Sequence, residues 1–150
     1  MPDEKITCII LSYKREPNIR VIIDAIRSQT VPSLILIWDN NNALDPGLAD
    51  KYPGLVLIRS TENFICRPRF ILPGLVKTPF IFNFDDDHTI LDRKLFERLI
   101  DLSGQYPRTF FGWPGRKEYG RFSRPEALHD RFIDFLNTGI SFYPTELCNK

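Results

Sequence analysis

Short apolar runs alternate in this chain with segments of helical periodicity, and this alternation constrains the fold more than any other feature. Residues 6–11 form a run rich in β-branched side chains, typical of a strand covered on both faces of a parallel sheet. Isoleucines then recur at helical spacing, at positions 19, 22, 23 and 26, behind a proline suited to a first helical turn. Residues 34–38 are a second apolar run. This order predicts a strand, a helix and a second strand.

Similar signals continue along the chain. The elements expected next are a short helix over 46–52 capped by Asp45, a strand at 55–58, a broken helix at 67–77, and a strand at 80–84. They are followed by a helix over 92–102 ended by Gly104, a strand at 109–113, a loop over 114–125, a helical stripe through Leu128, Phe132 and Phe135, and a strand at 139–143. We therefore predict an α/β fold, a Rossmann-like three-layer α/β/α sandwich with a mostly parallel central sheet.

Composition and charge exclude several classes of protein. Twenty basic and nineteen acidic residues leave a net charge of +1, so no overall field draws the chain to nucleic acid or to an anionic membrane. Three cysteines at unrelated spacings fit neither a disulfide framework nor a zinc motif, and we expect buried or inert thiols. The polar N-terminus does not resemble a signal peptide, and no apolar run approaches the ~20 residues of a transmembrane helix. We expect a soluble, cytoplasmic domain.

Polar tails follow three of the predicted strands. They comprise residues 12–15, residues 39–40 and residues 85–88. In open α/β sheets, ligands bind beyond the carboxyl ends of the strands, so these tails should share one edge. The sequence therefore predicts a binding site where the three tails meet.

An acid triplet, Asp85-Asp86-Asp87, forms the last of these tails. Three successive carboxylates repel one another, and a divalent cation would compensate them. Mg²⁺ or Mn²⁺ prefers oxygen ligands and is commonly held by one or two carboxylates together with substrate phosphates. Because side chains alternate along a strand, Asp85 and Asp87 should point to one side and Asp86 to the other, with Asp87 as the main ligand. A solvated turn, or caps for the next helix, is the alternative.

Residues 6 to about 90 resemble the family 2 glycosyltransferases and their relatives with the GT-A fold. Residues 9–15 are similar to that family's hydrophobic strand and its Thr/Ser-Tyr-Asn-Arg stretch, Trp38-Asp39-Asn40 resembles its second strand ending, and residues 81–87 resemble its Asp-x-Asp segment. The resemblance implies a single GT-A domain over 1–150 that transfers a sugar from a nucleotide-diphosphate donor to an acceptor hydroxyl, with inversion. Trp38-Asp39-Asn40 and the acid triplet are also similar to the exostosin-type transferases, which retain the anomeric configuration.

The resemblance implies roles for individual residues. Ser12 and Tyr13 would help to seat the nucleotide base, and Asp39 would contact the base or the ribose. Arg67 lies roughly where relatives carry a basic residue near the nucleotide, and Arg69 competes for that position. The residues expected to bind the donor are Ser12, Tyr13, Arg15, Asp39, Asn40, Arg67, Asp85 and Asp86, and those expected to hold Mn²⁺ or Mg²⁺ are Asp85 and Asp87. His88 is expected to be either a nearby polar contact or a surface side chain, and His129 is a candidate for the histidine ligand that this fold class commonly carries late in the chain.

A catalytic base is not assigned. In the family it belongs to an acidic pair beyond the counterpart of residues 139–146, and this chain ends before such a pair; Asp130 and Asp134 are expected to be surface charges. We therefore expect the domain to lack a C-terminal acceptor-binding part, either because the chain is cut from a longer protein or because it is a reduced relative. The basic and aromatic residues 116–122 would form either a lid over the donor or a solvated loop.

Two other functions fit parts of the sequence. Residues 82–89 also resemble the Asp-x-Asp-x-Thr signature of haloacid-dehalogenase-like phosphatases, with Asp85 as nucleophile and Asp87 as acid-base. That family usually places the signature on its first strand, which leaves the first 60 residues unexplained. The other alternative is a non-catalytic module that binds a nucleotide sugar, and turnover assays would distinguish it from a transferase.

Overall fold

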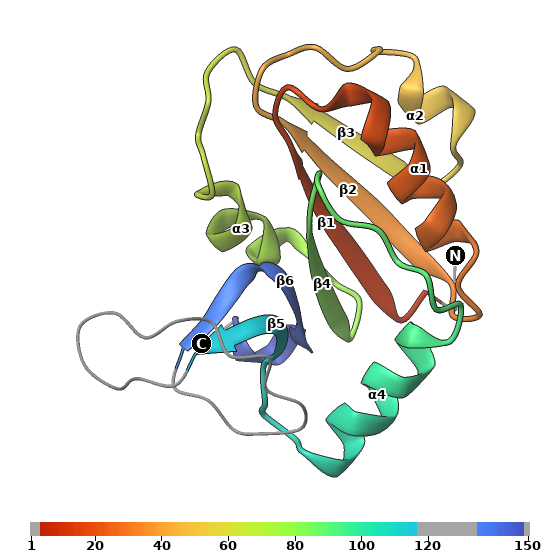
Figure 1. Cartoon of the computed structure of the whole chain (residues 1–150), viewed down its shortest axis with the longest axis vertical. Helices are drawn as coiled ribbons and strands as arrows, with labels where there is room; N and C mark the ends of the chain where they lie inside the picture. Colours follow the sequence, from red (N-terminus) through yellow and green to blue (C-terminus); the bar gives the residue numbers. More distant parts are fainter. Residues whose placement is uncertain (1–3, 117–134, 149–150) are drawn as a thin grey trace.

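A single six-stranded sheet organises the computed structural model, which describes residues 4–116 and 135–148 (Figure 1). The strand order is β3-β2-β1-β4-β6-β5. The strands are β1 (Ile6–Ser12), β2 (Ser33–Asp39), β3 (Leu55–Arg59), β4 (Phe80–Asp85), β5 (Phe111–Arg116) and β6 (Phe135–Pro144). The first four are mutually parallel, β6 is antiparallel to β4, and β5 is antiparallel to β6. The mostly parallel sheet predicted from the sequence is confirmed.

Helices cover both faces of this sheet. On one face, α1 (Glu16–Arg27), α2 (Leu48–Lys51) and α4 (Leu95–Gln105) pack in one apolar cluster with alternate residues of β1 and β4. On the opposite face, the short α3 (Pro68–Ile71) and the 3₁₀ turn η1 (Leu72–Leu75) pack on the other residues of these strands. A second 3₁₀ turn, η2 (Thr145–Leu147), follows β6. The three predicted layers are present, and the broken helix at 67–77 is confirmed.

The burial pattern explains why the strands were visible in the sequence. Every residue of β1 is buried, because helices lie on both of its faces, and the strand is accordingly apolar without alternation. Residues of β2 alternate between buried and half-buried, because only its α1 face is fully covered. α1 buries Ile19, Ile22, Ile23 and Ile26, and each of these side chains contributes about 1.5–3 kcal/mol to folding.

Several predicted boundaries were wrong. α4 begins at Leu95 and not at Asp92, whose carbonyl accepts the Leu95 amide in a turn before the helix. The helix continues through Gly104 to Gln105 and ends just before Pro107, which disfavours helical geometry at Tyr106. α2 is shorter than predicted and is capped by Gly47, whose amide binds the Asp45 carboxylate.

The last two strands also differ from the prediction. β5 begins at Phe111 and continues through Pro114 to Arg116, with a shift of register between Trp113 and Gly115 that accommodates the proline. β6 begins at Phe135, so Phe135 belongs to a strand and not to a helical stripe. The other residues of that stripe, Leu128 and Phe132, lie outside the described residues, as does the predicted loop from position 117.

The structure also shows the state of the cysteines and the character of the helices. All three cysteines are free; Cys8 is buried in β1, whereas Cys66 and Cys148 are exposed. Among the helices in the described ranges, none has both the length and the apolar character needed to cross a bilayer.

Candidate functional site

The three polar tails meet at one edge of the sheet. β1 lies between β2 and β4, so Ser12 is in register with Asp39 and Leu11 with Asp85. The backbone amide of Tyr13 donates to the Asp86 carboxylate at 2.6 Å, which connects the tails of β1 and β4 directly. The carboxyl ends of these three strands therefore lie together at one edge of the sheet, as predicted from the sequence.

Asp86 fastens the loop between β1 and α1 to the end of β4. Its carboxylate is almost fully buried and accepts the Tyr13 amide and, at 2.7 Å, the Arg15 guanidinium. The Asn18 side-chain amide donates to the Asp86 backbone carbonyl at 2.9 Å. Two of the residues predicted to bind the donor, Arg15 and Asp86, thus bind each other in this structure, and their part in donor binding stays a prediction.

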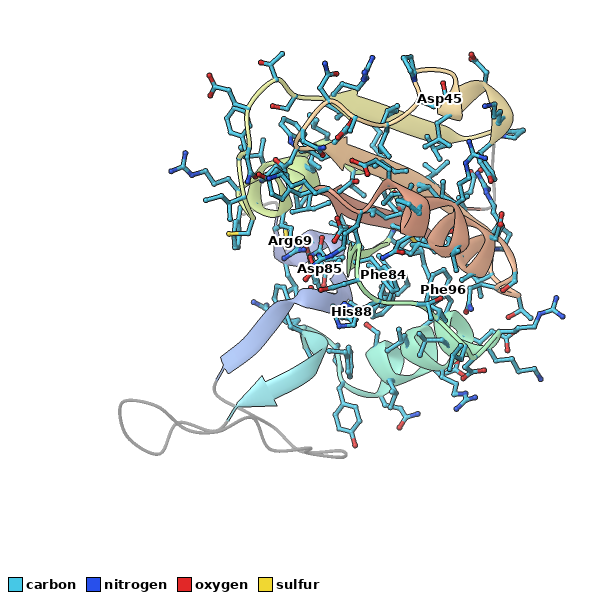
Figure 2. The ribbon with its side chains drawn as sticks, turned by 45° about the horizontal axis from the view of Figure 1, so that its top comes forward. Asp45, Arg69, Phe84, Asp85, His88 and Phe96 are labelled. Atoms are coloured by element: carbon cyan, nitrogen blue, oxygen red, sulfur yellow. The ribbon has the colours of Figure 1, made fainter. Side chains whose placement is uncertain are left out.

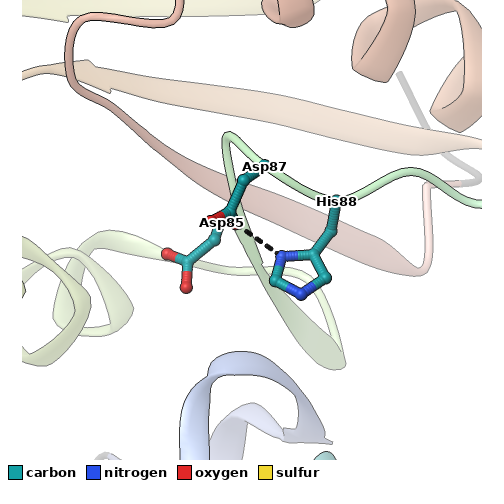
Figure 3. A group of neighbouring side chains, drawn as sticks. All are labelled: Asp85, Asp87 and His88. Atoms are coloured by element: carbon teal, nitrogen blue, oxygen red, sulfur yellow. Dashed lines mark ion pairs between the residues drawn. The ribbon is translucent and has the colours of Figure 1, made fainter.

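Asp85, Asp87 and His88 bring three possible metal ligands together (Figure 3). One carboxylate oxygen of each aspartate and one imidazole nitrogen all lie within 4.8 Å of one another. His88 Nδ1 lies 2.7 Å from Asp87 Oδ1. Asp85 is half-buried and the other two side chains are exposed, so an ion could reach the group from solvent. The two carboxylates suit the oxygen preference of Mg²⁺ or Mn²⁺.

Protein cations compensate part of the charge of the triplet. Arg69, which extends from α3, forms an ion pair with Asp85 (Figure 2). Arg15 lies 3.5 Å from Asp87 as well as binding Asp86. The sequence argument expected a divalent ion to compensate all three carboxylates, but Arg69 and Arg15 already neutralise two of them. Asp87, whose closest partner among the described side chains is His88, remains the carboxylate best placed to gain a metal.

Arg69, and not Arg67, is the α3 arginine that reaches the acid triplet. Arg67 is exposed at the start of α3, whereas only 7% of the Arg69 side chain is exposed. Burial lowers the pKa of the Arg69 guanidinium, and nearby carboxylates oppose this shift. The sequence left the two arginines in competition, because both flank Pro68 and a four-residue helix has no periodicity from which to infer orientation.

Asp39 and Asn40 shape the loops around the site. Asp39 is fully buried and accepts the amides of Asn41 and Leu44 at 3.2 and 2.9 Å, forming the turn that follows β2. Asn40 accepts the Phe64 amide at 2.9 Å and donates to the Ile65 carbonyl at 3.2 Å. The two residues tie the loop after β2 to the loop after β3. Their predicted contacts with the base or ribose are not tested by this geometry.

The part of the site at the end of β1 consists of Ser12, Tyr13 and Lys14. Ser12 Oγ is buried without a hydrogen-bond partner among the described residues. Tyr13 is partly exposed, and the Lys14 ammonium lies 5.0 Å from the centre of its ring. Lys14 has a φ of 61°, an uncommon conformation for a lysine, and Asn41 accepts its amide. The partly exposed Tyr13 ring thus lies at the carboxyl end of β1, with the Lys14 ammonium over it.

A family match accounts for this combination of fold and polar tails. Residues 6–126 match the family model described as the glycosyl transferase family 64 domain. This chain belongs to glycosyl transferase family 64. The expected relationship to nucleotide-sugar glycosyltransferases is thereby confirmed. The matching family agrees with the exostosin-type resemblance rather than with family 2 itself.

Relatives of this family 64 domain include Exostosin-2 from Mus musculus and from Homo sapiens. Each is 27% identical over 147 residues, an alignment that covers 91% of this chain. The chain spans 20% of the length of these curated relatives.

Solved structures share the fold. TarS 1–349 from S. aureus, in complex with UDP-GlcNAc, superposes with a TM-score of 0.71 at 16% identity, covering 97% of this chain and 46% of that chain. The mannosyltransferase PcManGT from Pyrobaculum calidifontis, in complex with GDP-Man and Mn²⁺, gives 0.62 at 17% identity, covering 76% and 36%. The predicted GT-A fold is therefore confirmed.

Sequence reasoning missed two asparagines of the candidate site. Asn18 holds the Asp86 backbone, and Asn41 connects the Lys14 amide to Glu16, whose pKa its hydrogen bond lowers. Asn41 sits in a run of three asparagines directly after β2, which was a usable signal; Asn18 lies in the first turn of α1 and gave none. The other predicted candidates, His129, Asp130, Asp134 and the lid beyond Arg116, lie outside the described residues.

Proposed function

We propose that this family 64 domain binds a nucleotide-diphosphate sugar and transfers the sugar to an acceptor hydroxyl, with the help of a divalent cation. The observation that carries the proposal is the convergence of Asp85, Asp87 and His88 at the edge where the tails of β1 and β2 also end. Ligands of open α/β sheets bind at this edge. The acceptor is proposed to be a saccharide or another hydroxyl compound, and the acceptor-binding part is proposed to lie outside residues 1–150.

Asp87 and His88 would hold the cation. Asp85 would become a further ligand when its ion pair with Arg69 is replaced by a bond to the cation. When bound, such a cation supplies positive charge that stabilises the leaving diphosphate. The remaining residues of the site would contribute by holding the groups that contact the nucleotide in place. Asp86 and Asn18 hold the loop after β1 against β4, which places the Tyr13 ring at the edge of the site. Arg69 adds a buried positive charge beside Asp85.

The family match also supports a proposal for the stereochemical outcome. The family 2 resemblance implied inversion, whereas the exostosin-type resemblance implied retention. Because the chain belongs to family 64 and its relatives include Exostosin-2, we propose retention. An NMR assignment of the anomeric proton of the product, before mutarotation, distinguishes the two outcomes.

Binding of nucleoside diphosphates tests the metal site. We expect UDP or GDP to bind with a dissociation constant in the micromolar to millimolar range, roughly −4 to −8 kcal/mol, and more tightly with Mn²⁺ than with EDTA. Asp87→Ala should abolish the effect of Mn²⁺, because it removes the most exposed carboxylate of the group. Asp101→Asn, which changes an exposed aspartate of α4, is the matched control and should bind like the parent chain. Calorimetric binding that ignores Mn²⁺ would contradict the proposal.

A non-catalytic module remains distinguishable from the transferase. Both bind the nucleotide sugar, so binding alone does not separate them. Transfer to an acceptor or hydrolysis of the donor, measured in the full-length protein, is expected of the enzyme only. Binding without either reaction would favour the module.

A further inference from the structure

A segment that is apolar on both of its faces connects β3 to β4. Over residues 68–76, which span α3 and η1, Arg69 is the only residue with a polar side chain. The residues that face the sheet are buried, and they are Pro68, Arg69, Leu72, Pro73 and Val76. A helical segment that is apolar all round is normally buried on every side. This segment is covered on its inner face only, and α3 lies at the margin of the ribbon in Figure 1.

The outer face of the segment presents large apolar side chains to water. Phe70 and Leu75 are each 68% exposed, and Ile71 is 61% exposed. Together with Gly74 they recur at helical spacing between the buried residues, so they share one face. A single exposed apolar side chain is ordinary at a protein surface, whereas several gathered in one short segment mark an interaction site.

Ile65 adds a fourth apolar side chain just before α3, and its backbone is strained. Its φ of 57° lies in the left-handed region, which is rare for a β-branched residue. The Ile65 amide donates to Asn63 Oδ1 at 2.8 Å, and its carbonyl accepts from Asn40 Nδ2 at 3.2 Å. The side chain is nevertheless 68% exposed. Strained residues persist where surrounding contacts enforce them, and they are concentrated at functional positions.

The exposed charges around these apolar side chains are positive. Residues 64–79 contain no aspartate or glutamate. Arg67 and Lys77 are exposed near the two ends of the segment, and no described residue forms an ion pair with either. Arg69 is buried and paired with Asp85. Two copies meeting through this face would bring like charges together, whereas an anionic bilayer would attract them. Apolar side chains flanked by lysine and arginine are typical of proteins that bind such bilayers peripherally.

We propose that this outer face docks on an anionic lipid bilayer. The residues that enter the interfacial region are Ile65, Phe70, Ile71 and Leu75, and those that lie among the headgroups are Arg67 and Lys77. The inference goes beyond the proposed function and needs neither a metal nor a nucleotide. Because Arg69 of the same short helix pairs with Asp85, docking would bring the acid triplet close to the bilayer surface.

A fluorescent reporter tests the docking directly. Phe70→Trp replaces an exposed ring and should fold normally. We expect its emission to shift to shorter wavelength on vesicles of phosphatidylcholine with about one third phosphatidylserine, at lipid concentrations on the order of millimolar or below. Val21→Trp, at an exposed position of α1 on the opposite face of the sheet, is the control and should not shift. If Phe70→Trp does not shift and the chain does not sediment with these vesicles, the proposal is wrong.

The apolar contribution is tested in the reporter chain. Ile71→Ser combined with Leu75→Ser should weaken vesicle binding about tenfold or more, because it removes two side chains that enter the interface. Val21→Ser combined with Leu91→Ser removes two exposed apolar side chains elsewhere and should leave binding unchanged. Circular dichroism checks that both variants are folded. Equal weakening by the two pairs would show that the outer face of α3 is not the contact, and would overturn the proposal.

The electrostatic contribution has its own pair of variants. Arg67→Gln combined with Lys77→Gln should weaken binding to the anionic vesicles about tenfold or more, and vesicles of phosphatidylcholine alone should bind about as weakly. Arg20→Gln combined with Lys94→Gln lowers the net charge equally at exposed positions elsewhere, and it should have little effect. Binding that is the same with and without phosphatidylserine would contradict docking on an anionic surface.

Self-association is the alternative use of this face. Sedimentation velocity of the parent chain should show no oligomer that the Ile71→Ser and Leu75→Ser pair dissociates. Such an oligomer, without vesicle binding, would assign the face to a second copy and overturn the proposal. Asp87→Ala should bind vesicles like the parent chain, because Asp87 lies outside this face. Loss of the Mn²⁺ effect with vesicle binding intact, or the reverse, therefore separates this inference from the proposed function.

Discussion

At the scale of single residues, neighbouring aspartates of the triplet have different structural roles. Asp86 is buried and accepts hydrogen bonds from Tyr13 and Arg15, whereas Asp87 is exposed beside His88. We predict that Asp86→Ala lowers the free energy of unfolding by about 1–3 kcal/mol, because it leaves a buried amide and a guanidinium without their acceptor. Asp87→Ala should change stability by less than about 0.5 kcal/mol while abolishing the Mn²⁺ effect. Urea denaturation of both variants measures the difference; equal losses of stability would contradict these roles.

The same contrast shows what sequence reasoning can recover at a residue. The location of Ser12, Asp39 and Asp85 at the ends of buried strands was enough to select them as neighbours, because the carboxyl ends of parallel strands meet at one edge of the sheet. It did not reveal that Asn40 would be used by two loops, or that Arg69 would turn toward Asp85. Those contacts depend on how the loops after β2 and β3 return to the sheet, and local sequence carries little information about such paths.

At the scale of elements, sequence periodicity predicted which helices and strands exist better than it predicted where they begin and end. β1 was predicted well because a strand buried on both faces is a continuous apolar run. α1 was predicted well because a helix buried on one face has apolar residues at helical spacing. Phe135 was placed in a helix because three apolar residues at positions 128, 132 and 135 imitate helical spacing, although Phe135 pairs with Arg116 across two strands. Gly104 was interpreted as a helix end, but α4 runs past it.

The glycine in α4 gives a prediction at this scale. A Cβ at Gly104 meets nothing within 4 Å, and the residue lies inside the helix. Gly104→Ala should therefore raise the free energy of unfolding by about 0.4–1 kcal/mol, by restricting the unfolded chain and favouring the helix. Gly54 is the matched control: its φ of 76° is unfavourable for alanine, so Gly54→Ala should destabilise the chain. Thermal or urea unfolding of the two variants measures whether the free energy of unfolding rises or falls in each. A destabilised Gly104→Ala would mean that α4 ends earlier.

At the scale of the whole molecule, the two faces of the sheet differ in coverage. The face under α1, α2 and α4 encloses the larger apolar cluster, which includes Cys8, Phe82 and Phe96. The apolar cluster under α3 and η1 is smaller, and it lies next to a pocket lined by Asn83. Stability should thus depend mainly on the first face, whereas the candidate site lies at the edge of the sheet. A probe buried in the first face reports on global unfolding with little direct effect on the site.

Cys8 is such a probe. Its side chain is fully buried in β1, and burial raises the pKa of the thiol from 9.0 to about 12. Between these values the unfolded chain releases the proton while the folded chain retains it, so the folded state loses relative stability as pH rises. With about 1.4 kcal/mol for each pKa unit, the loss approaches roughly 4 kcal/mol by pH 12 and is absent below about pH 9. Cys8→Ala should be less stable at pH 7 because of its cavity, yet its stability should fall less steeply between pH 9 and 12. Urea unfolding of both chains across this range measures the two slopes. Since lysines and tyrosines also titrate there, only the difference between the slopes reports on Cys8, and equal slopes would show that the thiol ionises with the chain still folded.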